Sequence, residues 1–150
     1  MKWKLNGKDC DEIPGEAIGF VYNITYTDGD YYVGKKLARS VRKIMLGKKE
    51  LAARPTKRHK NYKMVLKEHP WRDYEGSTVH SEGKTIAKKE IVAWCHTKVA
   101  MAYVETSLQI TMGVLFDPKA LNQNVGGKYF DNVLEKEVFN EDFYKVTEEK

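Results

Sequence analysis

The chain has 150 residues and a mass of 17.3 kDa, which suits one domain of roughly 100–200 residues. Its 41% hydrophobic content and mean hydropathy of −0.61 exclude a disordered chain, and no stretch approaches the roughly 18 apolar residues of a membrane span. The charged first residues predict no signal peptide, and two cysteines are too few for a disulfide scaffold or a four-ligand zinc site. We therefore expect a single cytoplasmic domain over residues 1–150, with no membrane partner and an acidic C-terminal tail.

Positive charge is concentrated in one segment. Residues 35–72 hold fourteen Lys or Arg against two Glu, a net charge of +12, whereas the rest of the chain carries −7. Because His, Tyr and Trp side chains are interleaved with these cations, the segment is typical of a protein that binds a polyanion. The sequence therefore predicts a long basic loop that binds nucleic acid; a solvated loop that only keeps the protein soluble is the plainer alternative.

The elements expected in chain order form a small domain. Residues 17–28 and 30–36 predict two strands joined at an Asp-Gly turn, and a third strand is predicted at 89–95. A helix is expected at 99–112, with Thr97 as its N-cap residue. Weaker signals indicate a short helix at 48–53, a strand or turn at 71–77 and irregular chain at 121–134. The predicted fold class is α+β: a small antiparallel three-stranded sheet flanked by helices, with the long basic loop.

The loop between the first two strands decides which side chains share a face. A two-residue loop would put Tyr22 and Tyr32 on opposite faces of the hairpin, because side chains alternate along a strand. A three-residue loop with Gly29 in the left-handed conformation would instead pair Tyr22 with Gly34. Both tyrosines and Lys36 would then lie on one face. We predict the three-residue loop.

Short motifs lie on these elements in a fixed order. They are Gly19-Phe-Val-Tyr22, Tyr32-Val33-Gly34 followed by Lys35-Lys36, Gly47-Lys48-Lys49, Trp71-x-x-Tyr74-x-Gly76-Ser77, Glu105 in the helix and Asn122-x-Asn124-Val125-Gly126-Gly127. Together they resemble the GIY-YIG nuclease family, and most of all its small phage-encoded, homing-endonuclease-like members. The resemblance covers about residues 18–130 and rests on the order of the set, although the first tripeptide, Phe-Val-Tyr, keeps only its terminal tyrosine.

This resemblance implies a metal-dependent DNA endonuclease that hydrolyses phosphodiester bonds. One divalent cation, Mg²⁺ or Mn²⁺, would be held by Glu105. The implied catalytic residues are Tyr22, Tyr32, Lys36, Arg42, Glu105 and Asn124. Arg39 and Asn122 also qualify for the family's arginine and asparagine positions, where Arg42 and Asn124 are the preferred candidates.

The residues themselves suit this chemistry. Mg²⁺ binds through one or two carboxylates together with waters and phosphate oxygens, so Glu105 is a sufficient anchor. Its helix carries an apolar stripe made of Met101, Val104, Leu108 and Met112. Beside that stripe a carboxylate is costly unless it is paired or coordinated. A tyrosine acts as a general base if nearby cations stabilise its phenolate; we expect Tyr22 to be that base and Tyr32 to position water or phosphate.

The expected partner is double-stranded DNA, which a homodimer would be able to cut in both strands. The residues expected to bind it are Lys35, Arg39, Lys48, Lys49, Lys57, Arg58, Lys60, Trp71 and Tyr74. The cations would contact the backbone, whereas Trp71 and Tyr74 would either stack on bases or pack the loop against the sheet. A non-catalytic nucleic-acid-binding module on the same fold is the alternative, followed by a protein-binding inhibitor that uses the acidic tail.

Overall fold

The computed structural model describes residues 1–130; the expected acidic tail lies outside the described residues. The elements are β1 (Lys4–Leu5), β2 (Lys8–Asp9), β3 (Gly19–Tyr26), β4 (Tyr31–Leu37), β5 (Arg39–Met45), α1 (Lys48–Ala52), β6 (Tyr62–Glu68), the 3₁₀ helix η1 (Val79–Ser81), β7 (Ile86–Cys95), α2 (Lys98–Met112), β8 (Asn124–Val125) and β9 (Tyr129–Phe130). Among these elements, no helix has the length and apolar character needed to cross a membrane.

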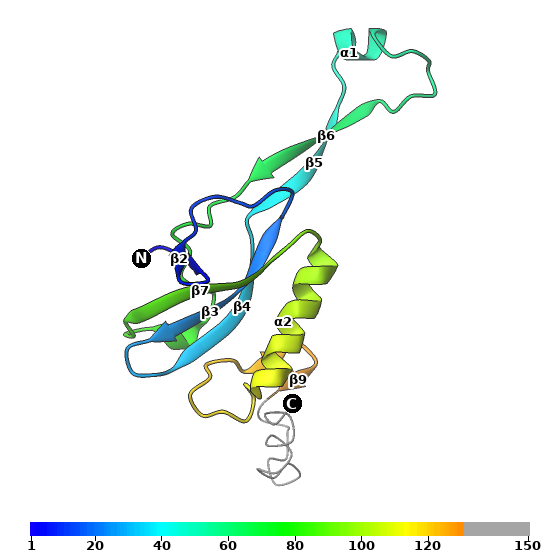
Figure 1. Ribbon diagram of the computed structural model, residues 1–150. Helices are drawn as coiled ribbons and strands as arrows, with labels where there is room; N and C mark the ends of the chain where they lie inside the picture. The colour runs from blue at the N-terminus through cyan, green and yellow to red at the C-terminus, as the bar shows by residue number, and fades with distance from the viewer. Residues whose placement is uncertain (131–150) are drawn as a thin grey trace.

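The α+β class is confirmed, but the sheet is larger than predicted. It has five strands in the order β2-β1-β7-β3-β4, and β1 pairs with β7 in parallel. Figure 1 shows β7, β3 and β4 side by side. The three predicted strands are its β7, β3 and β4, which pair antiparallel to one another. The two added strands are two residues long each, too short for alternation to reveal them.

The hairpin of β3 and β4 has the predicted register. Tyr22 lies opposite Gly34 and Ile24 opposite Tyr32, so the two tyrosines share a face. Gly29 has φ of 92°, in the left-handed region, and the amide of Tyr26 donates to the carbonyl of Asp30 at 2.8 Å. The three-residue loop is therefore confirmed.

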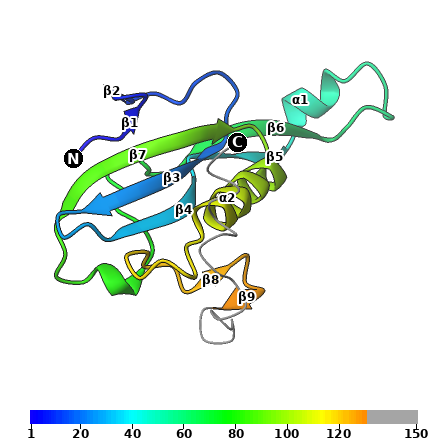
Figure 2. The same ribbon diagram turned by 60° about the horizontal axis from the view of Figure 1, so that its bottom comes forward.

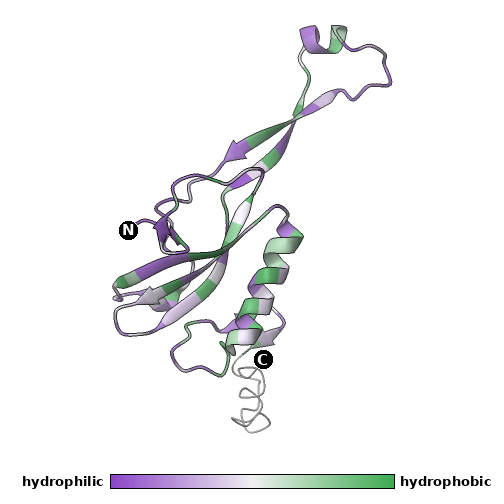
Figure 3. Cartoon of the chain, in the orientation of Figure 1, coloured by the Kyte–Doolittle hydropathy of each residue, from purple (hydrophilic) through white to green (hydrophobic). Residues whose placement is uncertain are grey.

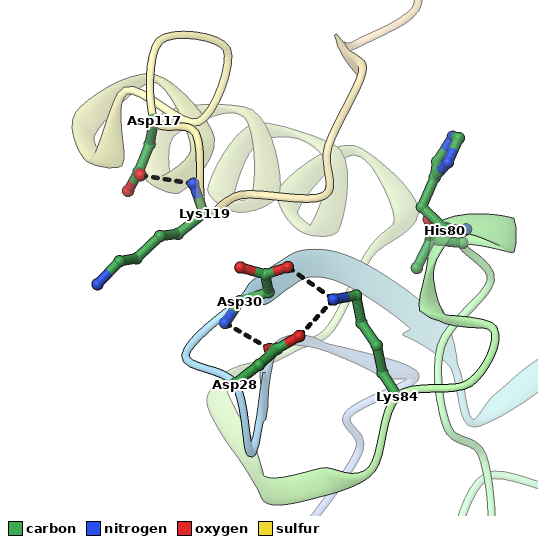
Figure 4. Close-up of polar contacts among 7 residues, drawn as sticks. Asp28, Asp30, His80, Lys84, Asp117 and Lys119 are labelled. Atoms are coloured by element: carbon green, nitrogen blue, oxygen red, sulfur yellow. Dashed lines mark hydrogen bonds and ion pairs between the residues drawn. The ribbon is translucent and has the colours of Figure 1, made fainter.

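Charged side chains hold this turn against the segment before β7. The ammonium group of Lys84 binds both Asp28 and Asp30, the latter at 2.8 Å (Figure 4). Asp28 also accepts a hydrogen bond from the backbone amide of Asp30. The hydrogen bonds to the two carboxylates raise the pKa of Lys84, and the bond from Lys84 lowers the pKa of Asp28. These contacts support the turn that sets the tyrosine register.

Each face of the sheet has its own core. One face packs Trp3, Phe20, Tyr22 and Trp71 together without a helix. The other face is covered by α2, which begins at Thr97, whose hydroxyl accepts from the amide of Ala100, and ends at left-handed Gly113 (Figure 2). The predicted helix and its N-cap are thus confirmed; its stripe packs against Val21 and Val33 of the sheet.

The basic segment is a β-ribbon rather than the predicted loop. β5 and β6 pair antiparallel from Arg39 with Glu68 to Met45 with Tyr62, and α1 lies in the connection at the far end. Figures 1 and 3 show the ribbon projecting from the sheet, and the colours of Figure 3 show hydrophilic and hydrophobic residues mixed along it. Because neither of its faces is buried in a core, the segment lacks the clean alternation that identifies a strand in sequence. The short helix expected at 48–53 is α1; it lies at the far end of the ribbon and does not flank the sheet.

Candidate active site

A cleft of about 390 Å³ lies at the edge of the sheet formed by β4. Its walls come from β4, from the loop around η1, from α2 and from the segment 121–127. Of the residues predicted to be catalytic, Tyr32, Glu105 and Asn124 line it, and the predicted DNA-binding Lys35 lines it too. Because β4 is an edge strand, side chains from both of its faces reach the cleft: Tyr32 from one and Lys35 from the other.

Glycine at position 34 allows Tyr22 to lie across β4. A Cβ atom at Gly34 would stand 2.5 Å from the Tyr22 hydroxyl oxygen and 2.9 Å from a ring carbon of Tyr32. The two tyrosine rings have centroids 6.2 Å apart, and the Tyr22 ring also meets Tyr74 edge-on at 5.8 Å. The absence of a side chain at Gly34 is therefore what brings the two phenols together.

The two phenols differ in their access to the cleft. Tyr22 is fully buried, and within the described residues its hydroxyl has no hydrogen-bond partner. Burial, and then the neighbouring Tyr74, raise the pKa of Tyr22 far above its usual value. These surroundings keep the Tyr22 proton in place, the opposite of the stabilised phenolate expected of a base. The Tyr32 hydroxyl, in contrast, reaches the cleft and lies 3.5 Å from the Ser77 hydroxyl.

Glu105 is the acidic group of the cleft. It lies on α2 with its side chain 14% exposed, and one carboxylate oxygen is 3.4 Å from the ammonium nitrogen of Lys35. Burial raises the pKa of Glu105, and the nearby Lys35 partly opposes that effect. The carboxylate is thus partly desolvated and has one flexible cation as its partner, an arrangement that favours binding a further positive charge.

The two candidate asparagines have different partners. Asn122 is buried; its carbonyl oxygen accepts from the amide of Val33 at 3.1 Å, and its amide nitrogen donates to the carbonyl of Val33 at 2.8 Å. Asn124 is exposed, and its side-chain oxygen accepts from the amide of Gly127 at 3.2 Å. The structure therefore uses the Asn122 amide to pair with the edge of β4, whereas Asn124 begins β8 at the cleft wall.

The predicted cations Lys36, Arg39 and Arg42 lie outside the cleft residues. Lys36 stands over the ring of Tyr74, 4.7 Å from its centroid. Arg39 donates to backbone carbonyls of the segment before β3, at 2.6 Å to Ala17. Arg42 is exposed on the ribbon. Neither arginine lines the cleft, so the structure does not bring to it the arginine that the resemblance implies.

Trp71 packs against the sheet instead of being available to bases. It is fully buried, its ring meets Phe20 edge-on at 5.8 Å, and its indole nitrogen donates to Glu68 at 3.2 Å. Of the two alternatives predicted for it, packing is the one the structure shows, and the base-stacking prediction for Trp71 is wrong. Tyr74 is half-buried beside Tyr22.

The cleft also contains polar residues that the sequence did not single out for it. His80 on η1 is exposed and lines the cleft, together with Ser77 and Gln109. Gln109 follows Glu105 by four positions and so lies on the same side of α2, a spacing that could have identified it. His80 carries no comparable signal, since only the fold of its loop brings it near Glu105.

The donor atoms of the cleft fit one hard divalent cation. The cleft offers the oxygen atoms of the Glu105 carboxylate, the Tyr32 hydroxyl and the Asn124 amide, beside the imidazole of His80. Mg²⁺ keeps several waters and needs only one or two carboxylates beside phosphate oxygens. Within residues 1–130 no cluster of three or more His, Cys, Asp or Glu exists, so a fully protein-coordinated metal such as structural zinc finds no site there.

A known protein family matches this chain. Residues 3–134 match the family described as "Putative endonuclease segE, GIY-YIG domain". Searches of curated proteins and of solved structures returned no match. The family match agrees with the ordered motifs and confirms the resemblance found in the sequence. Since it covers nearly the whole chain, the protein belongs to the segE family of GIY-YIG endonuclease domains.

Proposed function

We propose that the protein is a metal-dependent endonuclease that hydrolyses phosphodiester bonds of double-stranded DNA. The observation that carries this proposal is the convergence of Tyr32, Glu105 and Asn124 on one cleft, although they come from β4, α2 and β8. The family match supports nuclease activity, and nucleases of this family generally use divalent metals. Glu105 is the proposed ligand of Mg²⁺ or Mn²⁺.

Each residue of the cleft has a part in the proposed hydrolysis. A cation bound at Glu105 would supply positive charge where the phosphate accumulates negative charge. Tyr32 reaches the cleft and would replace Tyr22 as the base: its phenolate form would take the proton of the attacking water and become the neutral phenol. Tyr22, which its burial keeps protonated, packs its ring against that of Tyr32. Lys35 balances the Glu105 carboxylate before the cation binds and is free to contact a phosphate afterwards.

The DNA backbone would be held largely outside the cleft. Five exposed cations lie in and beyond α1 at the end of the ribbon: Lys48, Lys49, Lys57, Arg58 and Lys60. Among residues 1–130 none of them has an ion-pair partner within 4 Å, so their charges are available to phosphates. Such contacts depend on charge and give affinity with little sequence preference.

A nicking assay with one substitution tests the proposal. Glu105→Gln removes the proposed metal ligand with little change in shape, and supercoiled and linear plasmid are incubated with each variant in Mg²⁺ or Mn²⁺. The matched control is Glu90→Gln, because Glu90 is also partly exposed and also contacts a lysine, Lys88 at 2.7 Å, but lies on β7 outside the cleft. We expect metal-dependent cutting by the wild type and the control, and none by Glu105→Gln, which still binds duplex DNA.

The products distinguish the remaining possibilities. Nicked circles alone indicate a monomer acting on one strand, whereas linear plasmid formed in one binding event indicates the proposed homodimer. Salt-sensitive DNA binding without cutting in any divalent cation would contradict the proposal and favour a non-catalytic binding module. Equal cutting by wild type and Glu105→Gln would refute Glu105 as the metal ligand.

A further inference from the structure

The ribbon of β5 and β6 is a second candidate DNA-contacting surface, separate from the cleft. It follows β4 after a single buried residue, Ala38, and extends away from the sheet (Figure 1). All residues from Val41 to Met45 are exposed. Seven residue pairs keep a regular antiparallel register although no core covers them. Both faces are therefore open to a partner.

The register divides the ribbon side chains into two faces. Directly opposed residues lie on the same face of an antiparallel pair, and successive pairs alternate. We call one the basic face; it consists of the pairs Ser40–Lys67, Arg42–Val65 and Ile44–Lys63. The other, the apolar face, includes Val41–Leu66, Lys43–Met64 and Met45–Tyr62. Consecutive residues Arg42 and Lys43 thus point to opposite faces.

The two faces differ in their available charge. The basic face carries Arg42, Lys63 and Lys67, of which only Lys63 has an ion-pair partner among residues 1–130, namely Glu50. On the apolar face Lys43 lies 3.8 Å from the centroid of the Tyr62 ring, and its neighbours Met64 and Leu66 are 58% and 57% exposed. A polyanion is therefore attracted more strongly to the basic face.

The shape of the ribbon selects among nucleic acids. The major groove of B-form DNA is about 12 Å wide and admits a two-stranded β-ribbon. The major groove of A-form RNA is too deep and narrow for protein side chains to read. Arginine on a groove-facing position forms bidentate hydrogen bonds with guanine, the commonest base-specific contact. Arg42, central on the basic face and exposed, is the residue with that geometry.

The ribbon also has the length to reach beyond the cutting site. Seven residues at about 3.3 Å each extend about 23 Å, which corresponds to roughly seven base pairs at 3.4 Å. Within β4, the residues that line the cleft are Tyr32 and Lys35. The ribbon begins at Arg39, just beyond the C-terminal end of β4. If one DNA duplex binds to the cleft and to the ribbon at once, the ribbon contacts base pairs on one side of the cut only.

We propose that the basic face of the β5–β6 ribbon lies in the major groove of B-form DNA and reads base pairs displaced to one side of the scissile bond. This inference rests on the proposed nuclease function and adds to it a source of sequence preference. Arg42 makes the base contact, and Lys63 and Lys67, on the same face of the ribbon, lie in the groove on either side of it.

The test selects preferred sequences from random duplex DNA with the full chain in EDTA, where no cutting occurs. The selected duplex is then cut in Mg²⁺ to map the cut relative to the selected bases, and a duplex RNA serves as the A-form control. Arg42→Gln and Lys43→Gln form a matched pair, since each removes one positive charge from adjacent positions of β5 on opposite faces. Thermal unfolding verifies that both variants fold.

We expect selected bases on one side of the cut and weak binding to duplex RNA. Arg42→Gln lowers the preference for the selected over a scrambled duplex about ten-fold, whereas Lys43→Gln weakens binding to both duplexes equally. A selected sequence centred on the cut would overturn the inference, as would equal effects of the two variants. Slower cutting of every duplex by Arg42→Gln with unchanged selection would also overturn it. Failure of the wild type to bind or cut any duplex would instead refute the proposed function.

Discussion

Replacing Tyr22 by phenylalanine removes one oxygen atom from the middle of the sheet and separates stability from activity. The Tyr22 side chain is fully buried, and its hydroxyl has no hydrogen-bond partner within the described residues. Tyr26, on the same strand, provides a matched control: its side chain is 2% exposed, its hydroxyl also has no such partner, and it does not line the cleft.

The expected change in stability follows from the cost of a buried, unsatisfied polar group, about 1–3 kcal/mol. The lost oxygen also gives up a few dispersion contacts, so the net gain on Tyr22→Phe is about 1 kcal/mol. For a chain of this size that gain corresponds to an increase in Tm of about 2–4 °C. Because the Tyr26 hydroxyl also has no hydrogen-bond partner within the described residues, Tyr26→Phe should gain a similar amount.

Urea unfolding and plasmid nicking of the two variants form the assay. Both variants should be more stable than the wild type, but only Tyr22→Phe should cut DNA more slowly, because its hydroxyl lies behind Tyr32. If Tyr22→Phe instead lowers the free energy of unfolding by more than about 1 kcal/mol, the Tyr22 hydroxyl has a hydrogen-bond partner in solution, and the reasoning fails. Equal activity of Tyr22→Phe and wild type would remove Tyr22 from the catalytic site.

Three further predictions concern packing, pH and salt. Gly34→Ala forces a methyl group to within 2.5 Å of the Tyr22 oxygen, so urea unfolding should show a loss of about 1–3 kcal/mol, and retained wild-type stability would contradict the packing described. Burial raises the pKa of Glu105 above its ordinary 4.5, so the folded state binds the proton more tightly than the unfolded state does. Stability therefore falls as the pH rises from 4.5 through the raised pKa of the folded state. Glu105→Gln should remove that slope in pH-dependent unfolding, and the metal-dependent activity of the wild type should fall as pH drops through the raised pKa; an unchanged slope would refute the assignment. Lys57→Gln combined with Arg58→Gln should reduce the salt dependence of DNA binding by about two in log–log slope if both contact phosphates, and an unaltered slope would exclude them.

Local signals were enough to predict the hairpin that aligns the tyrosines. The Asp-Gly turn, with Gly29 able to adopt a positive φ, fixes the loop length, and the period of two then places every side chain of β3 and β4. The helix was equally predictable, because Thr97 and the apolar stripe both mark it. Glu105 could therefore be placed at the edge of a core before the fold was seen.

The remaining features depend on contacts between distant segments. β1 exists because Lys4 and Leu5 pair with residues of β7 that lie 86 positions later, and a two-residue strand has no pattern of its own. The basic ribbon was mistaken for a loop because charge repulsion and exposure, rather than a buried face, dominate its sequence. Trp71 was ambiguous for the opposite reason: only the assembled sheet provides the rings that surround it.

Asn122 gives the outer strand a neighbour without a sixth strand. Its one side chain forms hydrogen bonds with both the amide and the carbonyl of Val33. Two residues earlier on β4, the amide of Tyr31 donates to the carbonyl of Lys119, and the carbonyl of Tyr31 accepts from the amide of Leu121. An exposed strand of this kind would otherwise be a template for pairing with another chain. The same bonds tie the loop bearing Asn124 to β4, so any motion that widened the cleft on that side would also uncover an aggregation-prone edge.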